Sequence, residues 1–202
     1  MALTLYGMSK SRALRSIWAA EEIGIDYEHV PTSFTGESKA PEYLALNPNG
    51  RVPTLVDGDL VLFESMAINL YLAKKYGGAL YPDNPADEAR AIQWSIWGLS
   101  EIEPLQMELV VNVLMRSKED QDQAAMQGAA KALQRPLKVL DGVLADRPYL
   151  LGDTFSIADL NLAAVMALLA MVKHDYSEHS NVKRWADACY GRPSYAAARA
   201  KD

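Results

Sequence analysis

The sequence predicts two domains, a mixed α/β domain followed by an all-helical domain. In the first 77 residues, short apolar strands alternate with helical patterns in the order β-α-β-α-β-β-α. Glycines and prolines then gather between residues 77 and 85, a composition typical of a linker. No strand pattern follows. We therefore expect an α/β domain at residues 1–77, a linker at 78–86 and a helical domain at 87–202.

Composition excludes several classes of protein. The 202 residues carry a formal net charge of −6, and no run of Lys or Arg offers a surface for nucleic acid. The single cysteine, Cys189, cannot form a disulfide within the chain and is expected to be buried and inert. The longest apolar run, residues 160–172, is too short to span a bilayer, and residues 2–7 do not resemble a signal peptide. We expect a cytoplasmic protein with neither a nucleic-acid nor a membrane partner.

The first domain begins with a strand at residues 3–6. A helical pattern starts at Ser11 and stops at Gly24, and a second strand follows at residues 27–30. Because a helix joins these two strands, we expect them to be parallel. One or two helical turns are expected at residues 41–46.

The second half of this domain is predicted to be a hairpin and a helix. Residues 54–56 and 60–62 have strand character and are joined through an Asp-Gly turn, which is a strong hairpin signal. Residues 65–76 have a helical pattern that ends at two glycines.

The residues that flank the hairpin predict a binding site. Pro53 stands where a strand begins, and a cis Val52–Pro53 bond would leave the Val52 N–H and C=O free to pair with an extended peptide. Glu64 and Ser65 lie at a helix start, where backbone N–H groups and the helix dipole favour an anion. The pattern thus favours a site for a small charged peptide, and the alternative is an ordinary hairpin in which the proline only marks a turn.

The second domain is predicted to contain only helices. We expect one long helix at residues 86–115, with Ile92, Ile96, Leu99 and Ile102 facing inward. The other helices are expected at residues 122–145, 157–172, 181–190 and 194–199. Ser156 and Asp159 form a capping box at the start of the third of these helices, which is apolar on nearly all sides and should form the core.

One run of residues resembles a known family. Residues 47–68 read NPNGRVPTLVDGDLVLFESMAI, and this run resembles the NPxGxVPxLxDGDxxLxESxAI pattern of the glutathione S-transferases, closest to the plant phi class and related bacterial enzymes. The resemblance covers essentially the whole chain. It implies a thioredoxin-like N-terminal domain and a helical domain that forms most of the electrophile pocket. It also implies glutathione as co-substrate, no metal, a role in detoxification and a homodimer.

The resemblance also implies roles for the residues of the motif. The Val52 backbone would pair with the cysteinyl unit of glutathione, and Pro53 would be the cis-proline. Glu64 would meet the γ-glutamyl ammonium group and Ser65 its carboxylate. Lys39 would bind the glycyl carboxylate.

The remaining positions leave alternatives open. Arg51 stands where the phi class usually has glutamine, so it either contacts glutathione or is a surface charge. Serine-type members place the catalytic serine after the first strand and four residues before an arginine, which Ser11 fits. Ser9 is the alternative, because Met8-Ser9-Lys10 lacks the proline often found in this loop. Tyr6 is a further, weaker candidate, since tyrosine-type members place theirs nearby.

The resemblance implies that the protein activates the thiol of glutathione. A thiol has a pKa near 8.5, and lowering it by roughly two requires about 2.7 kcal/mol of preference for the thiolate. A hydrogen bond to a charged group contributes about 1.5–3 kcal/mol and a helix N-terminus roughly 0.3–1 kcal/mol. One serine hydroxyl at a helix start is therefore sufficient. The thiolate would attack an electrophilic carbon or a peroxide.

Two other functions are compatible with the same scaffold. One is a non-catalytic glutathione-binding or regulatory protein, and the other is a specialised glutathione-dependent lyase, isomerase or dehalogenase. A metal site is not expected, because the spacing of His174 and His179 matches no common one.

Overall fold

A computed structural model describes residues 3–202, which form two compact units. The first unit contains the residues up to 83 together with 190–202, and the second contains residues 84–189. The first holds a four-stranded mixed sheet with helices and the second is helical, so the predicted fold class is confirmed. Residues 190–202, which the sequence groups with the helical domain, pack in the sheet-containing unit. The exact domain boundaries stay a prediction.

The sheet contains both parallel and antiparallel pairs. Strand β1 is parallel to β2, as predicted, and antiparallel to β3, which forms the predicted hairpin with β4. The order across the sheet is β2-β1-β3-β4, which leaves β4 at an edge. The strands are β1 (Thr4–Tyr6), β2 (Glu28–Val30), β3 (Thr54–Asp57) and β4 (Leu60–Phe63).

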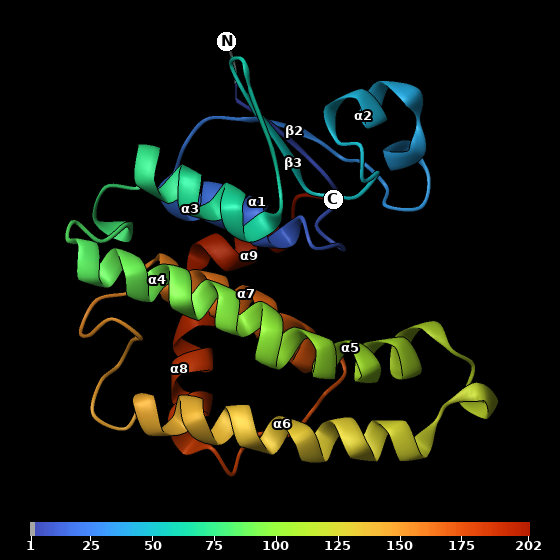
Figure 1. The fold of residues 1–202 in the computed structure, drawn as a ribbon, viewed down its shortest axis with the longest axis vertical. Coiled ribbons are helices and arrows are strands. Elements are labelled where there is room, and N and C mark those ends of the chain that lie inside the picture. The colour runs from blue at the N-terminus through green and yellow to red at the C-terminus, as the bar shows by residue number, and fades with distance from the viewer. Residues whose placement is uncertain (1–2) are drawn as a thin grey trace. The chain divides into compact units, whose positions relative to one another are not determined.

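Helix α1 lies at the centre of the helical layer of the first unit. It packs against both α3 and α9, whereas α2 lies apart from them (Figure 1). The helices of this unit are α1 (Leu14–Ile23), α2 (Pro41–Leu46), α3 (Ser65–Tyr76) and α9 (Pro193–Arg199), with short 3₁₀ turns at Glu37–Lys39 and Gly78–Leu80.

Polar and aromatic contacts bind the α9 segment, residues 190–202, to α1. The Trp18 indole N–H donates to the Ser194 hydroxyl at 3.1 Å, and its ring lies 4.8 Å from that of Tyr195. Arg192 forms two hydrogen bonds with the carboxylate of Glu22, one of them at 2.9 Å. These contacts explain why residues far apart in sequence share one compact unit.

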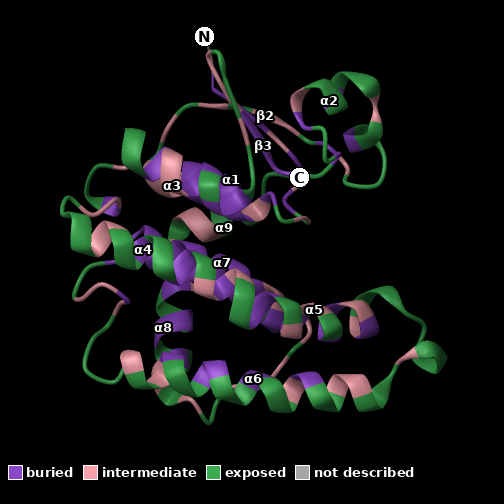
Figure 2. Ribbon diagram, in the orientation of Figure 1, coloured by how far each residue is buried: buried purple, intermediate pink, exposed green. Residues whose placement is uncertain are grey.

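The helical unit is built around α7. Twelve of its fifteen residues are buried, as expected from its apolar sequence (Figure 2). The helices are α4 (Pro85–Trp97), α5 (Glu103–Val110), α6 (Gln123–Val143), α7 (Ile157–Met171) and α8 (Ser180–Tyr190), with π-helical turns at Gly98–Ile102 and Val111–Met115 and a 3₁₀ turn at Lys118–Asp120.

The predicted inward face of the long helix was partly wrong. The side chain of Ile102 is fully buried, but Ile92 is 39% exposed and Ile96 is 60% exposed. Trp94 is buried in their place. The predicted single helix is also interrupted by the two π-helical turns.

Small residues explain which face of α4 is buried. A Cβ placed on Gly98 would lie 2.9 Å from a methyl group of Leu162, so the two backbones approach more closely than larger residues would allow. Ser95 is buried, and its hydroxyl accepts a hydrogen bond of 2.8 Å from the amide of Asn161. Close packing on α7 therefore selects the face with small residues rather than the face with isoleucines.

The predicted capping box at the start of α7 is present. One carboxylate oxygen of Asp159 accepts hydrogen bonds from the Ser156 N–H at 3.0 Å and the Ser156 hydroxyl at 2.8 Å. The other accepts from the Leu150 N–H at 2.8 Å and the Trp185 indole N–H at 2.9 Å. Burial raises the pKa of the Asp159 carboxyl, and these four hydrogen bonds oppose the rise.

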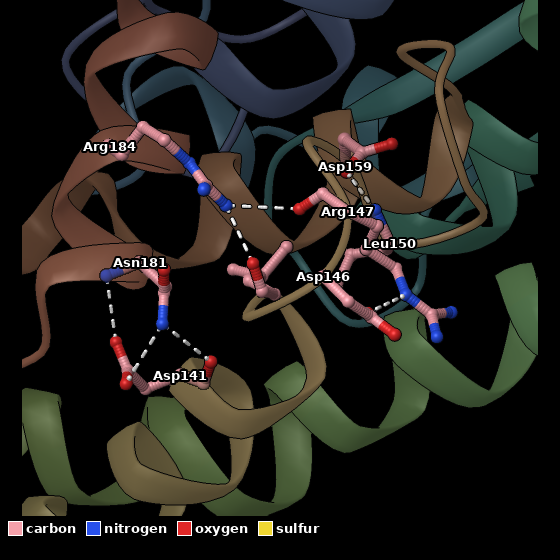
Figure 3. A network of polar contacts seen from close by, with 8 residues as sticks. Asp141, Asp146, Arg147, Leu150, Asp159, Asn181 and Arg184 are labelled. Atoms are coloured by element: carbon pink, nitrogen blue, oxygen red, sulfur yellow. Dashed lines mark hydrogen bonds and ion pairs between the residues drawn. The ribbon is translucent and has the colours of Figure 1, made fainter.

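A second polar network holds α8 in the helical unit (Figure 3). The Asp141 carboxylate on α6 accepts hydrogen bonds from the Asn181 N–H at 2.9 Å and the Val182 N–H at 3.2 Å, at the first turn of α8. Arg184 donates to the C=O groups of Leu144 at 2.7 Å and Arg147 at 3.0 Å. Every donor and acceptor named here is a group of this chain, so we infer that the network stabilises the fold and does not bind a ligand.

Candidate functional site

The register of the sheet places three loops at one end of it. Tyr6 at the end of β1 is paired with Thr54 at the start of β3, which is paired with Phe63 at the end of β4. The residues just beyond these positions are Gly7, Pro53 and Glu64. Three segments therefore begin side by side: the loop predicted to carry the catalytic serine, the loop predicted to pair with a peptide and the helix start predicted to bind an anion.

Gly7 allows the first loop to approach the second. Its φ is +130°, and a Cβ there would lie 2.4 Å from the Ala13 Cβ and 3.0 Å from the Val52 Cβ, too close for any side chain. The Gly7 N–H donates to the Val30 C=O at 3.0 Å, and its C=O is bonded to His29 Nε2 at 2.8 Å. The loop is thus fixed at the sheet, directly against Val52.

Helix α1 begins at Leu14, three residues later than the pattern suggests. Residues 9–13 form tight turns closed by bonds such as Ser11 N–H to the Met8 C=O at 3.0 Å. The half-buried Ser11 hydroxyl donates to the same C=O at 2.7 Å and accepts from the Ala13 N–H at 3.1 Å. These side-chain bonds compete with the helix for the backbone groups, which explains the delayed start.

The two candidate serines have different surroundings. Ser9 is 6% exposed, and both its N–H and its hydroxyl donate to Asp202, at 2.8 Å and 3.3 Å. Ser11 is half-buried just before α1, and its hydroxyl is bonded to the Met8 C=O and the Ala13 N–H of its own loop. Tyr6, the weaker candidate, packs its ring edge-on against Tyr43 with centroids 6.0 Å apart.

The second loop carries Val52 and Pro53. The bond between them is cis, and within residues 3–202 the Val52 N–H and C=O have no hydrogen-bond partner. The preceding carbonyl, that of Arg51, accepts from the Tyr43 hydroxyl at 2.7 Å and the Asn47 amide at 2.8 Å. The loop is therefore held from behind at Arg51, and the backbone of Val52 is left available.

The two basic candidates lie near this loop. Lys39 is exposed, and its ammonium group donates to the Gly50 C=O. A Cβ on Gly50 would come within 3.2 Å of the Lys39 Nζ, so the lysine lies against the loop backbone. The side chain of Arg51 is exposed, and its carbonyl rather than its guanidinium takes part in the recorded hydrogen bonds.

The third segment is the start of α3. Glu64 precedes the helix with φ +74° and ψ 110°, a conformation that a residue with a side chain rarely adopts. Such backbone strain is found preferentially at functional sites. Ser65 is the buried first residue of α3, and within the described chain its hydroxyl has no recorded hydrogen-bond partner. No side chain of residues 3–202 caps this helix start, which leaves its first N–H groups available to a ligand.

The structure thus groups most of the predicted residues around one end of the sheet. The sequence does not predict the side chains of His29, Tyr43 and Asp202, which hold the loops of this site through hydrogen bonds. None of them carries a sequence signal, whereas Asn47 belongs to the quoted motif. No group of His, Cys, Asp and Glu side chains in residues 3–202 is arranged to hold a metal ion, and no helix there is long and apolar enough to cross a membrane.

Comparison with known proteins identifies the family. Residues 1–74 match the model of the glutathione S-transferase N-terminal domain, and residues 102–193 match that of the C-terminal domain. Glutathione S-transferase 3 of Zea mays is 38% identical over 207 residues, which cover 96% of this chain and 91% of that protein. Glutathione S-transferase GstB of Escherichia coli K12 is 31% identical over 197 residues, with 95% of each chain covered.

Solved structures agree with this assignment. A theta-class glutathione S-transferase from Xanthomonas axonopodis pv. citri with glutathione bound has a TM-score of 0.89 and 34% identity, covering 100% of this chain and 98% of that one. Glutathione S-transferase-I bound with lactoylglutathione has the same TM-score and identity, covering 99% of both chains. The chain therefore belongs to the glutathione S-transferase family.

Proposed function

We propose that the chain binds glutathione at this end of the sheet and transfers it to an electrophilic small molecule. The observation that carries the proposal is the convergence of three features at one end of the sheet. These are the Ser11 hydroxyl, which is bonded to backbone groups of its own loop, the unpaired backbone of Val52 and the start of α3, which has no side-chain cap within residues 3–202. Together they match a short peptide that has a thiol at its centre and a charged γ-glutamyl end.

Each segment has a role in binding. The Val52 N–H and C=O pair with the cysteinyl unit as an added strand does. Ser65 and the N–H groups of α3 receive the γ-glutamyl carboxylate, and Glu64 receives the ammonium group. Lys39 exchanges the Gly50 C=O for the glycyl carboxylate, and Arg51, which directly follows Gly50 in the chain, is proposed to assist it.

Ser11 is proposed as the group that activates the thiol. Its oxygen accepts from the Ala13 N–H, which strengthens the hydroxyl as a donor. The hydroxyl hydrogen turns from the Met8 C=O to the sulfur, and the thiol proton leaves to solvent. The thiolate then attacks the electrophilic carbon and displaces a leaving group or adds to a double bond.

The test is the rate of conjugation of an aryl halide with glutathione, measured against pH for wild type, Ser11→Ala and Ser9→Ala. If Ser11 lowers the thiol pKa from about 8.5 to about 6.5, its removal reduces the rate about 30- to 100-fold below pH 7. The rate recovers above pH 9, where the free thiol ionises by itself. Ser9→Ala serves as the matched control and is expected within about threefold of wild type.

Other outcomes would redirect the proposal. Loss of activity in Ser9→Ala alone would transfer the catalytic role to Ser9. Tight glutathione binding without turnover of any electrophile in a broad panel would indicate a binding or regulatory protein. Turnover confined to a lyase, isomerase or dehalogenase substrate would indicate a specialised enzyme.

The proposed assembly is a homodimer in the cytoplasm. Leu60, Val61 and Phe63 on edge strand β4 are each 37–39% exposed. An exposed apolar edge strand is usually covered by a partner, and a second copy of this chain is the partner that we propose. Light scattering at micromolar concentration tests this assembly.

A further inference from the structure

One peptide unit links the candidate catalytic serine to the α9 segment. The C=O of the Met8–Ser9 peptide accepts the Ser11 hydroxyl at 2.7 Å and the Ser11 N–H at 3.0 Å. The N–H of the same peptide donates to a carboxylate oxygen of Asp202 at 2.8 Å. Ser11 and Asp202 therefore bind opposite ends of one rigid, planar group.

Asp202 is itself held in place. Its backbone C=O accepts a second bond from the loop, donated by the Ser9 hydroxyl at 3.3 Å. The neighbouring Lys201 forms an ion pair of 2.9 Å with Glu21 on α1 and lies 5.0 Å from the centre of the Tyr27 ring. The Tyr27 hydroxyl also donates to Glu21, at 2.7 Å. The α9 segment is thus anchored to α1 through Lys201, and from there the Asp202 carboxylate contacts the loop that precedes α1.

We propose that Asp202 is a positioning residue for Ser11, acting through the Met8–Ser9 peptide, and this rests on the function proposed above. An oxygen of the Asp202 side chain accepts the Ser9 N–H and so fixes the plane of the peptide. The peptide C=O and the Ala13 N–H then hold the Ser11 oxygen from two sides. The hydroxyl hydrogen rotates to the sulfur while the oxygen stays in place, so little reorganisation accompanies formation of the thiolate.

The proposal depends on the acceptor rather than on the charge, so two substitutions at one position test it. Asp202→Ala removes the acceptor. Asp202→Asn keeps an amide oxygen that accepts the same N–H, without the charge. Each variant is made in the full chain. The readouts are kcat at saturating glutathione against pH, the KM for glutathione, and the ultraviolet absorbance of the bound thiolate.

We expect Asp202→Ala to raise the apparent pKa of the bound thiol by about 0.5–1 and to lower kcat roughly 3- to 10-fold below that pKa, with KM within about twofold. Asp202→Asn restores the pKa and kcat to within about twofold of wild type. Amide exchange in loop 7–13 is faster in Asp202→Ala than in Asp202→Asn, because Ser9 and Ser11 lose protection.

The control is Asp187→Ala, which removes an exposed aspartate whose recorded partner, Lys183, lies on its own helix. It should leave all readouts unchanged. An Asp202→Ala pH profile that coincides with wild type overturns the proposal. So does an Asp202→Asn variant as impaired as Asp202→Ala, since the effect would then come from charge. A wild type that does not lower the thiol pKa refutes the proposed function itself, and the role of Asp202 with it.

Discussion

The starts of helices α7 and α3 use similar residues for different purposes. At α7, the carboxylate of Asp159 accepts four hydrogen bonds and the Ser156 hydroxyl is one of the donors. At α3, Glu64 makes no cap bond, its backbone has φ +74°, and the Ser65 hydroxyl has no recorded partner in the described chain. A helix start whose polar groups are satisfied within the chain stabilises the fold. A helix start that leaves them open is suited to binding a ligand.

The largest effect, on stability, is expected from removing the Asp159 carboxylate, which accepts four hydrogen bonds. Asp159→Ala leaves the buried N–H groups of Leu150 and Trp185 without acceptors, so the free energy of unfolding should fall by about 3 kcal/mol or more. Urea unfolding followed by tryptophan fluorescence measures this loss. The matched control is Asp146→Ala, whose side chain is 77% exposed, with a change within about 0.5 kcal/mol. Equal stability of the two variants would contradict the structural role of Asp159.

The second prediction is that Ser65 and Ser156 have opposite effects, Ser65 on glutathione binding and Ser156 on stability. If Ser65 binds the γ-glutamyl carboxylate as proposed, Ser65→Ala should weaken glutathione binding by about tenfold through loss of that hydrogen bond, while stability changes by less than about 0.5 kcal/mol. Ser156→Ala should do the reverse, lowering stability by about 1 kcal/mol and leaving binding unchanged. Calorimetric titration measures glutathione binding by both variants, and urea unfolding measures their stability. Unaltered binding in Ser65→Ala would remove that residue from the site.

The smallest effect concerns acid stability at the other end of α3. One carboxylate oxygen of Asp57 accepts from Lys75 at 2.8 Å, Tyr71 at 2.7 Å and Tyr76 at 2.8 Å. The bond from Lys75 is the main cause that lowers the pKa of Asp57 to about 2. A depressed carboxyl pKa stabilises the fold above the ordinary value near 3.8, and that stability is lost as the pH falls toward 2.

Asp57→Asn should therefore be less stable than wild type at neutral pH, and the difference should shrink on acidification below about pH 4. The urea midpoint measured at several pH values gives this difference. A constant gap between the two curves would show that the pKa of Asp57 is not lowered in the folded protein.

The parts of the molecule that the sequence predicts well are those encoded by neighbouring residues. The Asp57-Gly58 turn lies between the predicted strands, and the hairpin is present. Ser156 and Asp159 are three residues apart, so their capping box could be identified without tertiary information. The convergence of Pro53 and Glu64 follows from the same hairpin.

The features that escaped prediction depend on contacts between distant residues. Ile92 and Ile96 are exposed because Ser95 of α4 and Gly98, which directly follows that helix, pack more closely on α7. The late start of α1 depends on which backbone groups the Ser11 side chain binds. Asp202 lies 193 residues from Ser9, and nothing in either neighbourhood indicates that they meet.

The hairpin also separates the part of the chain that can vary in length from the part that cannot. Its register aligns Thr54 with Phe63 beside the loops of the proposed site, while the turn after Asp57 lies at the opposite end of both strands. Extra residues inserted in that turn would lengthen a surface loop without displacing Pro53 relative to Glu64. A single residue inserted within either strand would shift the pairing and turn its side chains to the other face of the sheet. Natural variation in length should therefore be tolerated at the turn and excluded from the strands.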